Sequence, residues 1–378
     1  MTILIHIGPP KTGTSAIQKA LKIAENSNHL KLNGIKYLNN ELSKNDILFF
    51  IAQIKSPLPR PYDQRFKPNL NAYINNSFIY MNNLINKNHK NISLYISSSE
   101  FLFRINKDEI IKLRNKLLKL DNDIRVITFM RDPVKLYISQ FSQNIKNSTL
   151  LSLPLETNHY QQLSKWEEIF KNNFYVYDYD KCMYSGNILL KFEEIINDIL
   201  KENNKNKIQL KTELLTNQSV SSELTHAIYK FRKINNLVND QYYDFLKLSR
   251  KKVSQITKNN NLNKLILTSE AKEHFIENNR KLYELLEKKY NFEFKYEIHK
   301  SLYSKKLDIN YFNDFNSIIN NYDRKVSDVI YNFLDEETKN FLHPIQFLKK
   351  YLRIFIKIFL KKVYFFLLKF YLNIKSNF

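Results

Sequence analysis

The chain has 378 residues, a formal net charge of +22 and 43% hydrophobic residues. Its single cysteine, Cys182, excludes an intrachain disulfide framework and indicates a reducing compartment. No nucleic-acid-reading module with clustered basic and stacking aromatic residues is recognisable, so no nucleic-acid partner is expected. The eight histidines lack metal-ligand spacing, so no metal is expected.

An apolar run at the N-terminus predicts a buried strand over residues 2–7 and leaves no room for a signal peptide. Two of the four glycines, Gly8 and Gly13, follow it, and a helical pattern opens at Thr12. Unpaired N–H groups at a helix start can hold an anion, glycine permits close approach, and Lys11 adds a mobile positive charge. The expected phosphate cradle consists of Pro10, Lys11, Thr12, Gly13, Thr14 and Ser15.

The order of residues in this loop separates it from the nucleotide-triphosphatase loop. In that loop the lysine directly follows the second glycine. Here Lys11 precedes Gly13 by two residues, and Thr14 and Ser15 follow the glycine. The Walker pattern is therefore absent.

Two further strands end in polar residues. One, over residues 92–97, runs into three serines and Glu100. The next, over residues 124–130, ends at Arg131, and Pro133 then suits the first turn of a helix that carries Ser139. The arginine offers a planar fork of donors for a phosphate, and a hydroxyl two turns along can reach the same group. By itself, however, an arginine such as Arg131 is more often a surface residue at a helix start than a ligand-binding one.

The remaining pattern alternates strands with helices. A strand is expected over residues 174–179, after Trp166. Near-continuous apolar strands separated by helices favour a parallel sheet in an α/β domain. The expected helices lie near residues 107–120, 134–146, 188–200, 222–235 and 270–290.

Both anion motifs together resemble those of the PAPS-dependent sulfotransferases, where PAPS is 3′-phosphoadenosine 5′-phosphosulfate. The segment Pro10–Ser15 looks like their 5′-phosphosulfate loop, and Arg131 with Ser139 has the spacing of their 3′-phosphate site. His6, Gln18 and residues 217–221 are similar to a bacterial carbohydrate-sulfotransferase-like branch, as are the strand before Glu100 and the Trp166 unit. The resemblance covers about the first three-quarters of the chain. His6 and Trp166 are interpreted as core residues, and Asn217 and Ser219 equally fit a helix cap.

The resemblance implies a fold, a co-substrate and catalytic roles. The implied fold is a P-loop-type three-layer α/β sandwich with a central parallel sheet, in which residues 33–90 form the variable acceptor side. PAPS is the implied co-substrate, without a metal. Lys11 is expected at the leaving-group oxygen, and Glu100 is the first choice for the base that deprotonates the acceptor. Rival bases are Glu25, His29, Glu41 and Asp46.

The C-terminal segment has a different composition. Residues 341–378 contain eight basic and no acidic residues, interleaved with aromatic and aliphatic ones. On a helical wheel the basic residues between Lys349 and Lys361 share one side, and the longest uncharged apolar run, residues 363–368, is far shorter than the roughly 20 residues of a spanning helix. The pattern favours a basic amphipathic helix lying on an anionic membrane surface, with packing on protein as the alternative.

These features combine into one interpretation. Residues 1–296 are expected to form the sulfotransferase domain, residues 297–340 a linker or helical extension, and residues 341–378 the membrane-associating tail. The expected function is transfer of a sulfuryl group from PAPS to a hydroxyl of a glycan or glycolipid precursor, on the cytoplasmic face of a membrane. The alternatives are a PAP- or PAPS-binding membrane-associated protein without catalysis, and a kinase-like phosphotransferase.

Overall fold

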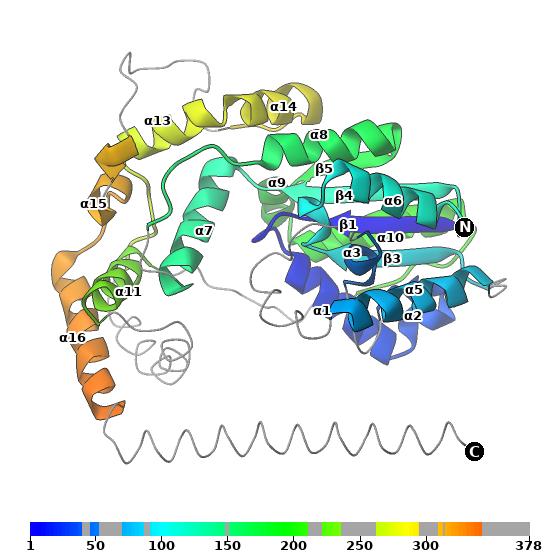
Figure 1. The fold of residues 1–378 in the computed structure, drawn as a ribbon, viewed down its shortest axis with the longest axis horizontal. Coiled ribbons are helices and arrows are strands. Elements are labelled where there is room, and N and C mark those ends of the chain that lie inside the picture. The colour runs from blue at the N-terminus through cyan, green and yellow to red at the C-terminus, as the bar shows by residue number, and fades with distance from the viewer. Residues whose placement is uncertain are drawn as a thin grey trace. The chain divides into compact units, whose positions relative to one another are not determined.

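A five-stranded sheet forms the centre of the structure, a computed structural model (Figure 1). The structure describes residues 1–39, 46–52, 70–86, 91–147, 151–210, 221–235, 262–294, 309–312 and 314–341. The strands are β1 (Thr2–Ile7), β2 (Ile35–Tyr37), β3 (Leu94–Ser99), β4 (Asp123–Met130) and β5 (Phe174–Asp178). All of them pair in parallel, in the order β2-β3-β1-β4-β5. The predicted α/β class with a parallel central sheet is therefore confirmed.

Helices cover both faces of the sheet, because alternate side chains of each strand point to opposite faces. Leu4, Ile96 and Phe129 pack with residues of α1 (Thr14–Asn26), α2 (His29–Leu32) and α10 (Ile188–Glu202). Ile3, Ile5 and Ile7 point the other way and pack with α3 (Ile47–Ala52), α6 (Lys107–Leu117) and α8 (His159–Phe170). Successive residues of a strand face opposite sides of a sheet, so helices cover both faces.

The register of the central strands brings their carboxyl ends to one edge. His6 of β1 lies opposite Ser98 of β3 and Ile127 of β4. Figure 1 shows β1 between β3 and β4. The loop after β1, Glu100 after β3 and Arg131 after β4 therefore share one edge of the sheet. In open α/β sheets such an edge, where the strand order reverses, is the usual ligand-binding position.

The other elements complete the description. They are α5 (Leu70–Asn86), η2 (Leu102–Arg104), α7 (Pro133–Asn147), η3 (Lys171–Asn173), α9 (Tyr179–Tyr184), α11 (Ser222–Asn235), α13 (Ser269–Asn278), α14 (Arg280–Tyr290), η4 (Ile309–Phe312), α15 (Phe315–Ile318) and α16 (Arg324–Phe341). Among the described residues, no helix combines the length and the apolar character that crossing a membrane requires.

The helix expected near residues 270–290 is two helices, with Asn279 between them. The Asn279 amide oxygen accepts hydrogen bonds from the backbone N–H and the hydroxyl of Thr157, both at 2.8 Å. Its amide nitrogen donates to the carbonyl of Leu155 at 3.2 Å. The backbone N–H of Asn279 still donates to the carbonyl of Phe275, so the side-chain bonds to a distant loop fix the junction of the two helices, and no local pattern announces them.

The chain forms two compact units. The first comprises Met1–Gln140, Leu153–Gln218 and Leu267–Phe312, and it contains the sheet. The described residues of the second fall within Phe141–Ser152, Ser219–Ile266 and Asn313–Phe378. In the second unit, α11 packs with α16, and the buried Glu223 carboxylate accepts hydrogen bonds from the backbone N–H groups of Asn263 and Asp323.

Candidate functional site

The loop between β1 and α1 has a conformation that requires glycine. Gly13, the N-cap of α1, has φ of 87°. A Cβ on Gly13 would lie 2.7 Å from Cδ1 of Ile188, inside van der Waals contact. The hydroxyl of Thr12 donates to the carbonyl of Pro9 at 2.7 Å and closes the turn. The loop can therefore lie this close to α10 only because Gly13 has no side chain.

Lys11 has an unusual backbone conformation within this loop. Its φ is 71°, in the left-handed region that lysine rarely occupies. Strained backbone of this kind concentrates at binding and catalytic sites, because the surrounding structure must hold it in place. Burial lowers the pKa of Lys11, and the negative charge of Glu100 opposes that shift.

The start of α1 has hydrogen-bonding groups available for an anion. No side chain caps α1, because its N-cap is a glycine. The first N–H groups of a helix have no partner within it and attract negative charge. The hydroxyl of Thr14 is also buried and has no hydrogen-bond partner among the described residues. A buried polar atom without a partner is costly, and a bound anion would supply one.

His6 lies beneath this loop. Its Nδ1 is 2.8 Å from the hydroxyl of Ser98, and its ring contacts Phe129 and Phe192. Complete burial lowers the pKa of His6 to about 3, so the ring is neutral at physiological pH. Nε2 of His6 has no partner among the described residues and lies 3.3 Å from where a Cβ on Gly8 would stand. The ring packs in the core, as expected, but one of its nitrogens is directed at the loop.

Glu100 follows β3 at the same edge. Burial raises the pKa of Glu100; the charge of Arg104 lowers it, Asp46 raises it and Lys11 lowers it. A carboxylate with a raised pKa is a stronger base, and perturbed groups of this kind cluster at functional sites. Lys11 and Glu100 are thus close enough to influence each other's ionisation.

Among the rival bases that the structure describes, Asp46 interacts electrostatically with Glu100. It is 8% exposed, and its carboxylate accepts a hydrogen bond from the Ser99 hydroxyl at 2.6 Å. That hydroxyl also accepts from the backbone N–H of Phe101, so it ties Asp46 to the turn that contains Glu100.

The other rival bases are engaged elsewhere or lie outside the described residues. Glu25, three turns along α1, pairs with Lys22 and accepts from Asn39. His29 accepts from the backbone N–H of Gln209. Glu41 lies outside the described residues, as do residues 217–220 and the tail from residue 342 onward.

Gln18 on α1 connects the loop region to β3. Its amide nitrogen donates to the carbonyl of Ser98 at 2.7 Å. The same serine contacts His6 through its hydroxyl. The N-terminal turns of α1 and the carboxyl end of β3 are therefore fixed to each other beside Glu100.

Arg131 lies at the end of β4 within a small charged cluster. Its Nε is buried without a hydrogen bond to any described residue and lies 3.8 Å from Oδ1 of Asp180. The same carboxylate pairs with Nζ of Lys135 at 3.2 Å and accepts from the backbone N–H of Asp132 at 3.0 Å. The Asp180 carboxylate thus faces two cations, and Asp132 at the start of α7 and Asp178 add further negative charge, so the cluster has no excess of positive charge.

Tyr179 connects the two parts of the site. Its ring lies 5.5 Å from the guanidinium carbon of Arg131. Its Cε2 lies 3.5 Å from the position of a Cβ on Gly13. The loop and Arg131 therefore both lie close to the same aromatic ring. The sequence analysis did not identify Tyr179, Asp180 and Ile188 as site residues. Their position at or after the end of the last strand is the only sequence feature that could have pointed to them, and it becomes informative only once the order of the strands in the sheet is known.

Ser139 is half-buried on α7, two turns beyond Arg131. The structure records no hydrogen bond between its hydroxyl and any described residue. Its part in an anion site remains a prediction. Trp166 is fully buried, stacked on Phe170, in agreement with a core role.

The geometry groups Lys11, the start of α1, Glu100, Asp46 and Arg131 at one edge of the sheet. Within the described ranges, no three His, Cys, Asp or Glu side chains gather in a way that could hold a metal. Comparisons of the chain with protein-family models, with curated proteins and with solved structures found no match.

Proposed function

We propose that this protein is a sulfotransferase that moves a sulfuryl group from PAPS to a hydroxyl of a glycan or glycolipid precursor. The single observation that carries the proposal is the arrangement around Tyr179, whose ring lies close to both Gly13 of the β1–α1 loop and Arg131. PAPS carries anionic groups on the 3′ and 5′ oxygens of one ribose, so a receptor needs two anion sites with space for that ribose between them and for the adenine beside it. The loop motif and the Arg131–Ser139 spacing resemble those of PAPS-dependent enzymes with a P-loop-type fold.

The residues present fit such a ligand. The uncapped start of α1 and the unpartnered Thr14 hydroxyl suit the 5′-phosphosulfate end. The guanidinium of Arg131, whose Nε lacks a hydrogen bond among the described residues, suits the 3′-phosphate. The hydroxyl of Ser139 is a second candidate donor for that phosphate.

The proposed chemistry assigns one role to each charged group. The bond between sulfur and the 5′-phosphate oxygen breaks, and a new bond forms between sulfur and the acceptor oxygen. Lys11 stabilises the negative charge that develops on the leaving oxygen, an effect that is large in a partly desolvated site. Glu100 takes the proton of the acceptor hydroxyl, and Asp46 helps to keep the pKa of Glu100 raised.

The membrane part of the proposal rests on the sequence of residues 341–378 alone. A basic amphipathic tail on an anionic leaflet would hold the enzyme beside lipid-linked glycans, on the cytoplasmic face of the membrane.

Transfer of labelled sulfate tests the enzymatic proposal. Purified protein is incubated with PAPS labelled in its sulfuryl group and a panel of bacterial glycolipids and polysaccharides. We expect protein-dependent labelling that Lys11→Ala reduces by about 100-fold or more, the size of effect seen for one group that stabilises developing charge. Lys31→Ala removes the same charge from α2 and serves as the matched control.

The proposal fails if no acceptor is labelled by the unaltered protein, or if Lys11→Ala and Lys31→Ala label equally well. Circular dichroism and thermal melting of both variants establish that they are folded.

A further inference from the structure

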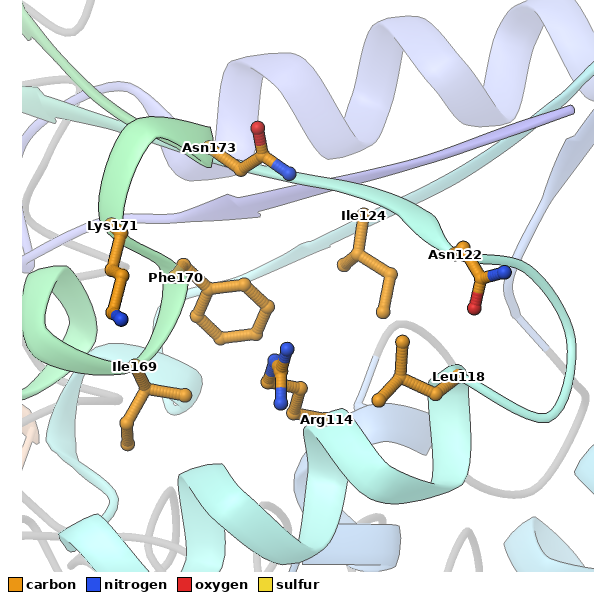
Figure 2. Close-up of a pocket in the computed structure, with 8 residues that line it drawn as sticks. All are labelled: Arg114, Leu118, Asn122, Ile124, Ile169, Phe170, Lys171 and Asn173. Carbon is orange, nitrogen blue, oxygen red and sulfur yellow. The ribbon is translucent and has the colours of Figure 1, made fainter.

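A separate cavity lies at the opposite edge of the sheet from Lys11. Its volume is about 250 Å³ (Figure 2). Ile124 contributes from the start of β4, and Asn173 directly precedes β5. The cavity therefore lies at the amino ends of the strands, whereas the candidate sulfotransferase site lies at their carboxyl ends. It belongs to the first unit.

The cavity has a mixed lining. Its apolar residues are Ile124 and Phe170, which are 2% and 6% exposed, together with Leu118 and Ile169, and its other four residues are polar or charged. Figure 2 shows Arg114, from the last turns of α6, reaching into the space below Phe170. An apolar body is favoured in such a cavity, since burial removes its surface from water.

Two cations line the cavity without a counter-charge. The side chains of Arg114 and Lys171 make no hydrogen bond or ion pair with any residue that the structure describes. The carboxylates beside them in sequence are already engaged. Asp121 pairs with the N-terminal ammonium, Asp123 with Arg125, and Glu168 with Lys107. A net positive charge therefore lies among the residues that line the cavity.

The backbone of Lys171 is a second, independent sign of function. Its φ is 49° and its ψ is −120°. Every other described non-glycine residue with a positive φ is an asparagine, except Lys11 of the candidate sulfotransferase site. Asparagine tolerates the left-handed helical region, but the ψ of Lys171 places it outside that region as well, which costs free energy in any residue with a Cβ, and such outliers cluster at binding sites.

We propose that this cavity binds a small organic anion, with a carboxylate on an apolar body about the size of one ring. The fork of Arg114 suits a carboxylate, Lys171 adds charge, and the amides of Asn122 and Asn173 offer further donors at the rim. The volume lies below the roughly 300–1,000 Å³ of pockets for drug-sized ligands, so the ligand is smaller than a nucleotide. This site is distinct from the one assigned to PAPS.

Methyl NMR of the full-length protein tests the assignment, with benzoate as the probe. We expect the methyl signals of Ile124 and Ile169 to shift saturably with a Kd on the order of 1 mM, as suits a ligand of this size. Acetate lacks the ring and benzamide lacks the charge, so each should bind about ten-fold more weakly or not at all.

Variants locate the charge that binds. Arg114→Gln and Lys171→Gln should each weaken benzoate binding by about ten-fold, because each loses a contact with an ionised group. Lys116→Gln is the matched control: Lys116 is on the same helix, but its Nζ donates to Asn82 at 2.6 Å, outside the cavity. Lys11→Ala should bind benzoate normally, which separates this site from the sulfotransferase proposal.

The assignment is overturned by the absence of saturable shifts at Ile124 and Ile169. It is also overturned if benzamide binds as well as benzoate, or if Arg114→Gln and Lys171→Gln both bind as well as Lys116→Gln.

Discussion

Asp180 influences the proposed 3′-phosphate site through charge. Its carboxylate lies beside both Arg131 and Lys135 and would repel a bound phosphate. We expect Arg131→Ala to weaken PAP binding by about 2 kcal/mol, roughly 30-fold, as for a lost charge-assisted contact. Asp180→Asn should instead strengthen PAP binding by up to about five-fold, because it removes a negative charge whose repulsion of the phosphate costs about 1 kcal/mol of binding free energy. Calorimetric titration measures both.

The 3′-phosphate assignment is tested by whether Arg131→Ala weakens PAP binding while Asp180→Asn strengthens it. Asp198→Asn removes the same charge from the exposed side of α10 and should leave PAP affinity unchanged. If Arg131→Ala binds PAP normally, the 3′-phosphate assignment is wrong.

The raised pKa of Glu100 has a consequence for stability. Because the pKa in the folded state is above the ordinary value of 4.5, the carboxylate destabilises the fold once both states are ionised. That penalty is absent below the unfolded pKa and develops as pH rises through the folded pKa. We expect Glu100→Gln to raise the melting temperature by about 1–3 °C at pH 8 and to have no effect near pH 4.

Thermal melts of both proteins from pH 4 to pH 8 measure the difference. A stabilisation that is the same at every pH would mean that ionisation of Glu100 is not its cause. If Glu100→Gln were less stable than the unaltered protein at pH 8, the conclusion that burial raises the pKa of Glu100 would be wrong.

The positions of some individual site residues could be predicted from the sequence. Lys11, Gly13 and Arg131 follow strands directly, so their places at strand ends could be read from the apolar runs before them. The link between Asp46 and the Glu100 turn could not, since it depends on a hydrogen bond across 53 positions. Tyr179 and Asp180 also could not, because only the pairing of β5 with β4 brings them beside Arg131.

Among the elements, the β1–loop–α1 unit depends most on one residue. Gly13→Ala would keep φ at 87° for a residue with a Cβ and would press that Cβ against Ile188 at 2.7 Å. We expect a loss of about 1–3 kcal/mol in the free energy of unfolding. Urea denaturation measures it, with Ser15→Ala, at an exposed position in the first turn of α1, as the control, expected to change stability by about 0.5 kcal/mol or less.

An unchanged stability for Gly13→Ala would show that the loop can move away from α10. The close contact with Ile188 would then not fix the position of the loop.

The elements themselves differ in how far they could be predicted. Strands β1, β3, β4 and β5 agree with their predicted positions to within two residues, and the largest shift is that of β3, which begins and ends two residues later than expected. Strand β2 has only three residues, Ile35–Tyr37, too few for a periodic signal. The break between α13 and α14 depends on the contacts of Asn279 with residues 155 and 157.

For the whole molecule, the parallel sheet was predictable and the order of its strands was not. Alternating strands and helices indicate a parallel sheet, but they do not say that β1 lies between β3 and β4. The two units also interleave, since each is made of three separate segments of chain. Long-range packing decides both properties.

The net charge of +22 bears on the proposed membrane partner. The tail contributes eight of the basic residues and no acidic ones. We expect removal of residues 342–378 to abolish most co-sedimentation with vesicles that contain anionic lipid, because each basic residue near such a surface contributes about 1 kcal/mol. Neutral vesicles are the control. Undiminished binding of the shortened protein to anionic vesicles would place the membrane contact elsewhere in the chain.

Calorimetric titration of the full-length protein with PAP, in the presence of a metal chelator, tests the central claim most directly. A parallel titration uses ATP with Mg²⁺. The account predicts saturable PAP binding with a Kd on the order of 1 μM and no need for metal, with ATP and Mg²⁺ binding more weakly. Binding to ATP with Mg²⁺ alone, or no binding to PAP, would contradict it.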